Sequence, residues 1–450
     1  MNHVEEIQKN PVKSTITLAI PIIVLLFLDT LYSVADIYWI NGLGTSAIIC
    51  MGYIANAVYT LNKIGDGIGR SVNVLISTAF GAKENEKTKI YAQHGFILIF
   101  IISLIIPLIT IPFIKGICFA AGIGEYGDLI YAYLAPLLAF IILSMMGNYF
   151  SALLGSEGDT KRATIIVTAG NLVNLILDPI LIFNLKLGML GAGIATCIGC
   201  GFSFLLFVYI FKIRRDTLVK IDFEGFRFNR NISWEIIKLA IPIILDGVLI
   251  SIVGIIINYG LHLYATPVAC FTYVILLKIQ TTAFTPIHGI NKGLCIVTGH
   301  LAGAKRFITL KDTIRKIFLR VLVIAVIISI ILVSFDTQIV TFFSSDHVFL
   351  SEVRNMLIFV VIITLVYPLI VGTSFVFVGL EKSIYTLYFV IFNLAMLIGF
   401  IAIFNHILGL SSLGIFSALI LSNIIEAVVM LVVLRIMLNR RISETEIANV

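Results

Sequence analysis

The chain has 450 residues, of which 59% are hydrophobic and only 12% are charged, and its mean hydropathy is +1.07. This composition excludes a water-soluble globular protein and predicts a polytopic membrane protein. The formal net charge of +6 therefore bears on the orientation of the chain in the membrane, and we expect no nucleic-acid partner.

Apolar runs of membrane-spanning length recur along the whole sequence and predict an all-α integral membrane protein with twelve transmembrane helices. They cover residues 15–40, 46–79, 92–116, 128–154, 163–184, 189–211, 235–260, 267–298, 317–342, 353–379, 384–406 and 411–435. The polar first residues lack the features of a cleavable leader, so no removable signal peptide is expected.

The basic residues predict the orientation of these helices. Most Lys and Arg lie in the two termini and in the loops after even-numbered runs, whereas only Lys115, Lys186 and Arg354 lie in the opposite loops. The positive-inside rule then places both termini in the cytoplasm of a multi-pass protein of the cell membrane.

The sequence also contains an internal duplication. The segment LAIPII starts at Leu18 and again at Leu239, and GAK at 81–83 recurs at 303–305, an offset of about 220 residues. Two six-helix lobes related by a pseudo-two-fold axis along the membrane normal are predicted, an arrangement that suits alternating access. The expected domains are an N-lobe at 1–211, a cytoplasmic linker at 212–232 and a C-lobe at 233–450. A channel is disfavoured because no filter-like repeated loop is present.

Carboxylates lie within two of the apolar runs. Asp29 and Asp36 are two turns apart on one face of the first run, and a carboxylate facing lipid is costly. In the fifth run Asn171, Asn174 and Asp178 follow the spacing i, i+3 and i+7 and share a face. Their hard oxygen atoms suit Na⁺, while a lone buried acid needs only H⁺, and the residues leave both ions open.

Basic residues form a second unusual pattern inside the membrane. Lys63, Asp66 and Arg70 form a stripe on the second run. The equivalent run of the second half carries Lys278, His288 and Lys292. These residues either form ion pairs that hold or gate the helices, or shape a cavity for an anionic or zwitterionic ligand.

The motifs TLYSVADIYWINGLG, STAFGAKENEKTK, ALLGSEGDTKRA, NLVNLILDP and GMLGAGIAT resemble the multidrug and toxic compound extrusion (MATE) family, most closely its archaeal and DinF-like branch. The resemblance runs through all twelve runs and is stronger in the first half. It implies a secondary antiporter, not an enzyme, that exports organic, cationic amphipathic compounds in exchange for Na⁺ or H⁺. It implies no cofactor, and a monomer whose partners are a small-molecule substrate and membrane lipids.

By the same resemblance, a cation-coupling site that could hold Na⁺ consists of Asp36, Asn174, Asp178 and Thr196. The resemblance also implies that Tyr32, Tyr133 and Asn148 line the neighbouring substrate cavity, to which the shared helix faces add Asp29 and Asn171. Aromatic rings there could bind an organic cation by its charge and its apolar surface. Asp29 departs from the family, in which an amide or apolar residue is more usual.

Two other functions compete with this interpretation. A flippase of the same superfamily, moving a lipid-linked or anionic substrate, would use Arg70 and Lys292 to bind phosphate. A membrane enzyme would need paired metal-binding carboxylates or a nucleophile and base in a loop, and neither is found. The pair Cys197 and Cys200 has no second pair or histidine nearby, so packing is preferred to zinc or redox chemistry.

Overall fold

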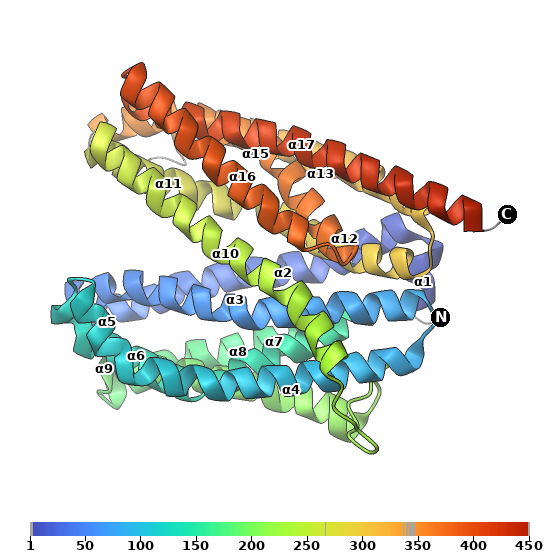
Figure 1. Ribbon diagram of the computed structural model, residues 1–450. Helices are drawn as coiled ribbons and strands as arrows, with labels where there is room; N and C mark the ends of the chain where they lie inside the picture. Colours follow the sequence, from blue (N-terminus) through green and yellow to red (C-terminus); the bar gives the residue numbers. More distant parts are fainter. Residues whose placement is uncertain (1–2, 266, 336, 339–340, 342–346, 449–450) are drawn as a thin grey trace. The chain divides into compact units, whose positions relative to one another are not determined.

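The computed structural model describes residues 3–265, 267–335, 337–338, 341 and 347–448, and this part of the chain is helical without strands (Figure 1). Helices are expected of such apolar runs because a helix satisfies its own backbone hydrogen bonds, which lipid cannot do. The chain divides into two compact units. Unit 1 comprises Met1–Ile7 and Ile20–Ile244, and unit 2 comprises Gln8–Ala19 and Leu245–Val450.

Two long helices contribute residues to both units. They are α2 (Pro11–Asn41), which follows the short α1 (His3–Lys9), and α10 (Arg230–Tyr264). The division falls within or directly after the two copies of LAIPII, next to Pro21 in α2 and close to Pro242 in α10. The two copies of the repeated sequence therefore lie at two of the places where the chain passes from one unit to the other.

The other helices of unit 1 follow in chain order. They are α3 (Thr45–Gly81), α4 (Asn85–Thr110), α5 (Ile114–Ala120), α6 (Gly127–Ala139), α7 (Ile141–Ser156), α8 (Thr160–Pro179) and α9 (Gly188–Val208), with the short turns η1 (Ile111–Phe113), η2 (Gly124–Tyr126), η3 (Ile180–Asn184) and η4 (Tyr209–Arg214). Phenylalanines fill the core between α7 and α9, where Phe150 lies 5.0 Å from Phe211 and 6.0 Å from Phe207 between ring centroids.

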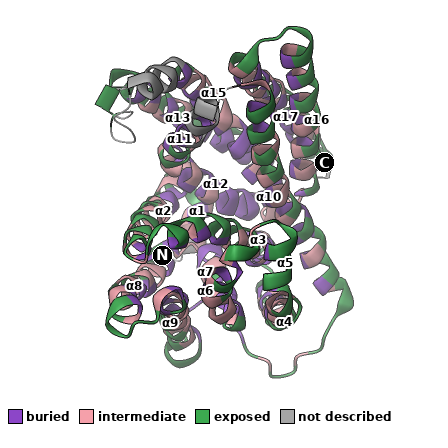
Figure 2. Ribbon diagram, turned by 90° about the vertical axis from the view of Figure 1, so that its left-hand side faces the viewer, coloured by how far each residue is buried: buried purple, intermediate pink, exposed green. Residues whose placement is uncertain are grey.

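Unit 2 is built from the corresponding helices of the second half. They are α11 (Pro267–Ala283), α12 (Thr285–Gly303), α13 (Phe307–Ser334), α15 (His347–Gly379), α16 (Ile384–Ile401), the turn η5 (Ala402–Ile407) and α17 (Ser411–Ala448). A hydrophobic cluster that includes Leu276, Leu397 and Ile415 forms part of its core. α12 is buried over most of its length (Figure 2).

Two of the expected continuous helices are broken. The run at 128–154 forms α6 and α7, which meet at Phe140 with a bend of 53°. Pro136 precedes the break and cannot donate a backbone hydrogen bond. The run at 267–298 is likewise interrupted at Phe284, where Pro286 lies in the first turn of α12. Proline explains both departures from the sequence prediction.

Length and composition separate two of the predicted spans from the rest. In the described residues, nine helical segments are long and apolar enough to cross a membrane, and the bent pair α6 and α7 makes a tenth. The others in the predicted set are α3 and the pair α11 and α12. Polar residues such as Asp66 and Arg70 in α3 and His288 and Lys292 in α12 lower their hydropathy.

The turns of the two halves repeat each other in detail. Lys83 and Lys305, the last residues of the two GAK motifs, have positive φ angles of 62° and 55°. Each lysine follows the end of a helix, and the backbone N–H of the next residue donates a hydrogen bond of 2.9 Å to a carbonyl of that helix. The bonds run from Glu84 to Ala79 and from Arg306 to Leu301. A non-glycine residue is uncommon in this left-handed region, so its recurrence is strong structural support for the duplication.

The π-helical turns recur as well. η3 follows Pro179 directly at the end of α8, and η5 occupies the equivalent place at the end of α16. π-helical turns are rare in proteins as a whole, and those that occur are often found at functional sites. In unit 1 this turn comes directly after Asp178 and Pro179.

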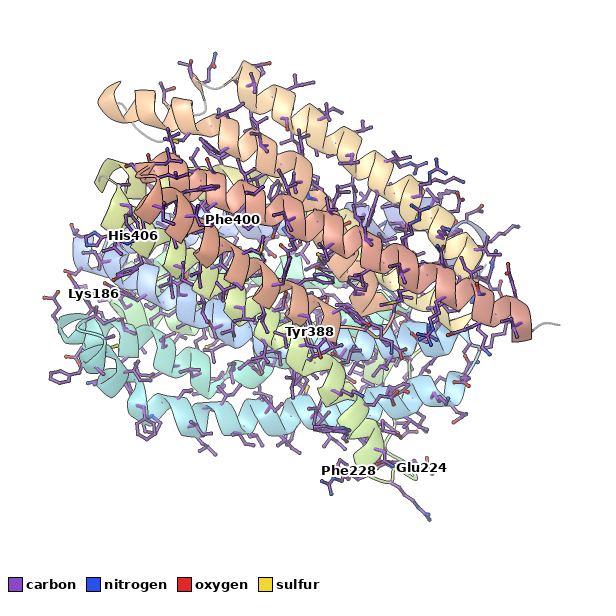
Figure 3. The ribbon with its side chains drawn as sticks, turned by 45° about the horizontal axis from the view of Figure 1, so that its top comes forward. Lys186, Glu224, Phe228, Tyr388, Phe400 and His406 are labelled. Atoms are coloured by element: carbon purple, nitrogen blue, oxygen red, sulfur yellow. The ribbon has the colours of Figure 1, made fainter. Side chains whose placement is uncertain are left out.

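The segment between η4 and α10, which belongs to unit 1, is held against α4. His94 Nε2 accepts a 2.9 Å hydrogen bond from the backbone N–H of Asn229, and Gln93 donates to the carbonyl of Asp222. The rings of Phe96 and Phe223 are 5.4 Å apart. Glu224 and Phe228 mark this segment in Figure 3.

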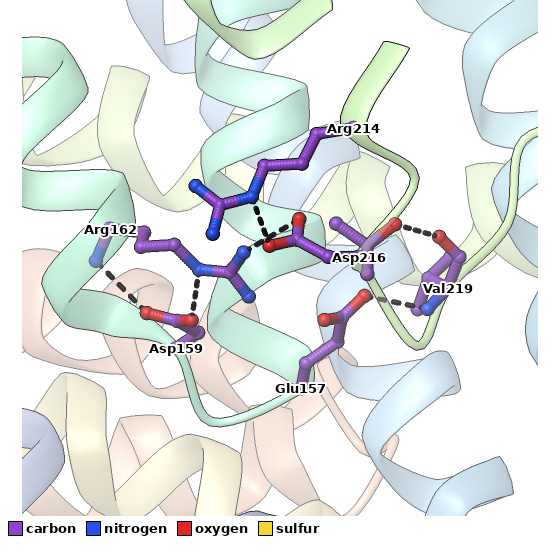
Figure 4. A network of polar contacts seen from close by, with 7 residues as sticks. Glu157, Asp159, Arg162, Arg214, Asp216 and Val219 are labelled. Carbon is purple, nitrogen blue, oxygen red and sulfur yellow. Dashed lines mark hydrogen bonds and ion pairs between the residues drawn. The ribbon is translucent and has the colours of Figure 1, made fainter. Parts of the chain in front are cut away.

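A polar network fixes the first part of the same segment (Figure 4). Glu157 is 2% exposed, and its carboxylate accepts a 2.6 Å hydrogen bond from the backbone N–H of Val219. Arg162 bonds to Asp159 and lies 2.9 Å from Asp216. Arg214 adds a 2.7 Å contact to Asp216. Burial raises the pKa of Glu157 to about 7, because the desolvated carboxylate is disfavoured despite its hydrogen bond.

Candidate functional site

The polar residues predicted on α2 and α8 lie in the interior of unit 1. Asp36 is 6% exposed, Asn174 is 3% exposed and Asp178 is fully buried. Carboxylates and amides are rarely buried in a membrane-spanning protein unless they pair with one another or serve a function. The predicted shared face of α8 is therefore its buried face.

Glycines on α9 bring neighbouring helices close to Thr196. A Cβ atom on Gly199 would lie 2.7 Å from the carbonyl oxygen of Gly170 on α8, and one on Gly193 would lie 2.5 Å from the carbonyl oxygen of Tyr133 on α6. Small residues allow such close backbone approach in membrane helices. Thr196 lies between these two glycines at i+3 and i−3, so it reaches residues of both α8 and α6.

The hydroxyl of Thr196 lies near polar side chains of three other helices, α2, α6 and α8. It accepts a hydrogen bond of 3.3 Å from the Asn174 amide and donates one of 3.0 Å to the carbonyl of Ala192. Tyr32 on α2 and Tyr133 on α6 lie close to the side chain of Thr196. Both tyrosines also interact electrostatically with Asp36 and Asp178.

Four buried oxygen atoms of this cluster have no hydrogen-bond donor among the described residues. They are Asp36 Oδ1, Asn174 Oδ1, Asp178 Oδ1 and Asp178 Oδ2. An unpaired buried polar atom costs about 1–3 kcal/mol, and a charged one costs more. Asp36 and Asp178 also interact with each other electrostatically. The arrangement has the chemistry of a cation or proton site, because either one would supply the missing partner.

Three further residues expected to line the cavity are Asp29, Asn171 and Asn148. Asn171, one turn before Asn174, donates a hydrogen bond of 2.7 Å to Asp29. The Thr164 hydroxyl donates a hydrogen bond of 3.0 Å to the carbonyl of Pro21. This bond joins α8 to the turn of α2 that contains the proline. Asn148 is exposed on α7, and no side-chain hydrogen bond joins it to the cluster in the described part of the chain.

The charged stripe on α3 contains the expected ion pair. Arg70 Nη2 lies 2.5 Å from Asp66 Oδ2, with side-chain exposures of 21% and 36%. Lys63 Nζ lies 4.9 Å from the ring centroid of Tyr59, within cation–π range. In unit 2, the ring of His288 lies 6.1 Å from that of Tyr367, Lys292 lies one turn further along α12, and Lys278 lies on α11.

A second acid and amide pair in unit 2 was not predicted as a site. Asn393 on α16 donates a hydrogen bond of 2.8 Å to Glu426 on α17, and Glu426 is 4% exposed and interacts electrostatically with Asp246. Asn393 is the repeat equivalent of Asn171, and each donates to a carboxylate of another helix. The recurrence of the dipeptide Asn-Leu at 171 and 393 was the available signal.

Cys197 and Cys200 lie close to this region on α9. Both are free thiols in the structure. Within the described residues, no group of three or more His, Cys, Asp or Glu side chains is placed to hold a metal ion. The oxygen atoms of the Asp36 cluster, which include an amide, are instead the ligand type suited to a hard cation.

Comparison with known proteins identifies relatives that cover nearly the whole chain. The family model MatE matches residues 21–180 and again 242–405. The multidrug export protein MepA of Staphylococcus aureus (strain MSSA476) is 26% identical over 438 residues, which are 95% of this chain and 94% of that protein. MepA of Staphylococcus haemolyticus (strain JCSC1435) is 27% identical over 383 residues, 82% of this chain and 81% of that protein.

Solved structures share the fold of the chain. An outward-facing multidrug resistance MATE family transporter of the MOP superfamily has a TM-score of 0.94 at 25% identity, covering 98% of this chain and 99% of that one. A MOP superfamily transporter from Pyrococcus furiosus has a TM-score of 0.92 at 25% identity over 98% of this chain and 99% of that one. For that protein a reverse polarity of the binding pocket has been taken to suggest a different function.

Proposed function

Because the chain belongs to the MatE family, whose model matches both of its halves, we propose that it exports amphipathic organic cations by antiport with Na⁺ or H⁺. The family consists of multi-pass membrane transporters of small molecules, and the chain is a transporter rather than an enzyme. The coupling ion, its binding residues and the charge of the substrate are the new elements of the proposal.

The observation that carries this proposal is a set of four buried oxygen atoms on Asp36, Asn174 and Asp178 that have no donor in the described part of the chain. A transporter coupled to a cation needs a site that is charged or polar when empty and satisfied when filled. Two neighbouring carboxylates meet this need, because a bound cation offsets their mutual repulsion. Loss of the ion would restore the unsatisfied state and favour binding of a cationic substrate.

The residues fit Na⁺ as well as H⁺. Carboxylate and amide oxygens are the ligands that hard cations prefer, and Asn174 keeps its oxygen available because its nitrogen donates to Thr196. A proton could instead convert one carboxyl oxygen into a donor. The aromatic rings of Tyr32 and Tyr133 next to the acids could bind an organic cation through its charge and its apolar surface.

Transport in proteoliposomes tests the role of Asp36. We expect Asp36→Asn to abolish uphill export of a cationic dye while the protein still inserts and purifies. The matched control is Asp128→Asn, which removes an exposed carboxylate paired with Lys115 at 2.6 Å. Export by the Asp36 variant at the rate of the control would refute the coupling role.

Trp39 supplies a direct reading of ion binding, because it lies one turn after Asp36. The chain has two tryptophans, so a Trp234→Phe background isolates its emission. We expect Na⁺, or a pH change, to alter this emission, and Asp36→Asn to abolish the response. A response to Na⁺ but not K⁺ identifies sodium coupling, and a response to pH alone identifies proton coupling.

A flippase of a lipid-linked or anionic substrate is the alternative function. The ion pair of Asp66 and Arg70, with Lys63 nearby on α3, favours it because basic side chains inside a membrane can bind phosphate. Two results together would support this function over the export of cations. They are binding of a lipid pyrophosphate that depends on Arg70 and Lys292, and a preference for anionic over cationic dyes.

The orientation is part of the proposal, with both termini in the cytoplasm of a monomer in the cell membrane. It rests on the bias of basic residues toward the termini and the even-numbered loops. Labelling of a single cysteine introduced at Glu444 with a membrane-impermeant reagent tests it. Labelling only after the membrane is opened is expected, and labelling of intact cells would reverse the orientation.

A further inference from the structure

A pocket of about 550 Å³ lies within unit 2, between the start of α2 and the first turns of α13. Its size falls in the range of small-ligand sites, which is about 300–1,000 Å³. It takes no part in the ion site described above, which lies in unit 1. Its lining residues are Lys9, Asn10, Pro11, Val12, Lys13, Ile16, Thr17, Asp312, Lys316 and Arg320.

The wall formed by the start of α2 is fixed to the rest of unit 2. Arg306 Nη1 donates a hydrogen bond of 2.6 Å to the carbonyl of Gln8. Further along, α12 lies directly against α2, since a Cβ on Gly293 would lie 2.7 Å from the carbonyl oxygen of Thr15. The start of α2 is therefore held in unit 2 by packing against α12 and by a charged hydrogen bond from the residue that precedes α13.

Positive charge dominates the pocket. Lys9, Lys13, Lys316 and Arg320 line it together with a single acid, Asp312. Asp312 is engaged with Lys316 at 2.6 Å. Lys9 and Arg320 make no ion pair within the described part of the chain. The surplus of positive charge favours an anionic ligand, and phosphate is the anion for which Arg and Lys are best suited.

The pocket continues onto a face of α13 that is suited to acyl chains. Asp312, Lys316 and Arg320 follow one another at i+4, and Val323 and Ile327 continue the same stripe. Val323 is 58% exposed and Ile327 is 51% exposed. Arg320 is the last charged residue of α13, so the pocket lies where the charged end of the helix meets its apolar part.

We propose that this pocket binds the phosphate headgroup of an anionic phospholipid, with the acyl chains along the exposed apolar face of α13. Basic pockets at the membrane surface attract anionic lipids, and each Lys or Arg near that surface contributes favourably. A soluble phosphate shares the headgroup chemistry, but it has no use for the apolar stripe that begins at Val323. The stripe therefore favours the lipid.

Native mass spectrometry of the purified full-length protein tests the proposal. The protein is titrated with phosphatidylglycerol or with zwitterionic phosphatidylcholine of the same acyl chains. We expect a preference for phosphatidylglycerol and roughly 30-fold weaker binding of it to the double variant Lys13→Gln and Arg320→Gln, the fold-change that corresponds to about 1 kcal/mol for each basic residue.

The control variant neutralises two exposed arginines outside the pocket, Arg315→Gln next to Lys316 on α13 and Arg441→Gln on α17. It should bind phosphatidylglycerol as the unmodified protein does. Arg320→Lys preserves the charge and should retain binding within about threefold, which separates loss of charge from misfolding. Equal binding of both lipids, or equal losses in the pocket variant and the control, would overturn the proposal.

The source of the phosphate is tested by competition. Glycerol phosphate and inorganic phosphate are added at millimolar concentration to the complex with phosphatidylglycerol. We expect neither to displace the lipid, because they lack acyl chains. Displacement, together with equal affinity for the soluble ligand, would overturn the lipid assignment. The measurement reads binding alone, so its result is independent of the proposed ion coupling.

Discussion

The side-chain nitrogen of Asn174 donates a hydrogen bond of 3.3 Å to the hydroxyl of Thr196, while the buried amide oxygen of Asn174 has no donor among the residues that the structure describes. This contact orients the amide, because the nitrogen is the group that can donate. Thr196 thus positions a cation ligand without needing to contact the cation itself.

Removal of that hydroxyl should weaken ion binding. Thr196→Val keeps the shape of the side chain but leaves the Asn174 amide free to rotate. An interhelical hydrogen bond of this kind contributes about 1 kcal/mol in a membrane, so we expect roughly fivefold weaker binding of the coupling ion. The measurement is the midpoint of the Trp39 emission titration.

Thr168→Val is the matched control for this change. Thr168 also lies on α8, and its hydroxyl has no hydrogen-bond partner in the described residues. It should leave the midpoint unchanged. If both threonine variants shift the midpoint equally, Thr196 has no specific role in orienting Asn174.

The close approach of α8 and α9 predicts a strong effect of one methyl group. In Gly199→Ala the new Cβ would meet the Gly170 carbonyl at 2.7 Å and the Cβ of Asn174 at 2.8 Å. Overpacking of this kind costs about 1–3 kcal/mol. We expect a lower melting temperature in detergent and, because α8 must move, weaker ion binding. Gly147→Ala on α7, where a Cβ would meet no described atom within 4 Å, should have little effect on either quantity.

The hydrogen bond between Asn171 and Asp29 predicts that substitutions of its two partners lower the stability by different amounts. Asn171→Leu removes the donor at 2.7 Å and leaves Asp29 without it, which should cost about 1–3 kcal/mol of stability. Asp29→Asn keeps an acceptor oxygen and should cost less. Thermal unfolding of both variants measures the difference, and a greater loss in Asp29→Asn would contradict the importance of the hydrogen bond.

Glu157 predicts a pH dependence with a definite sign. Burial raises its pKa from 4.5 to about 7, so the folded protein binds this proton more tightly than the unfolded chain. Between these two values the folded state carries more protons, and stability falls as pH rises. Over this pH range the free energy of unfolding falls by about 3 kcal/mol, and the fall is complete above a pH of about 7.

We therefore expect Glu157→Gln, which keeps an acceptor for the Val219 N–H, to remove part of the fall in melting temperature between about pH 5 and 8. The difference between the two proteins isolates Glu157 from other buried acids. Glu86→Gln, at an exposed position in the first turn of α4, should show the same pH profile as the unmodified protein. An identical profile for Glu157→Gln would contradict this assignment.

The sequence predicted much of the fold because its main signals are local or repeated. Hydrophobic length identified the helical runs, and LAIPII and GAK identified the duplication that the matching φ angles of Lys83 and Lys305 support. The spacing of Asn174 and Asp178 placed them on one face, as the structure does. The inclusion of Thr196 came from family resemblance, since no local pattern connects it to α8.

Contacts between distant segments escaped prediction. The bond of Asn393 to Glu426 joins two helices of unit 2, and that of Glu157 to Val219 joins a loop to the linker. Periodicity describes one helix at a time and says nothing about which helices meet. The broken helices at Phe140 and Phe284 were missed because their apolar runs continue through the breaks, although Pro136 and Pro286 marked the places.

The polar character of α3 has a consequence for biogenesis. Insertion by the translocon depends on the partitioning of each segment between the protein channel and lipid, and charged residues near a helix centre oppose it. With Lys63, Asp66 and Arg70 in one stretch, α3 is poorly suited to enter lipid as a solitary helix, and α12 with His288 and Lys292 has the same handicap. We therefore expect the integration of α3 and of α12 to depend on helices already inserted beside them.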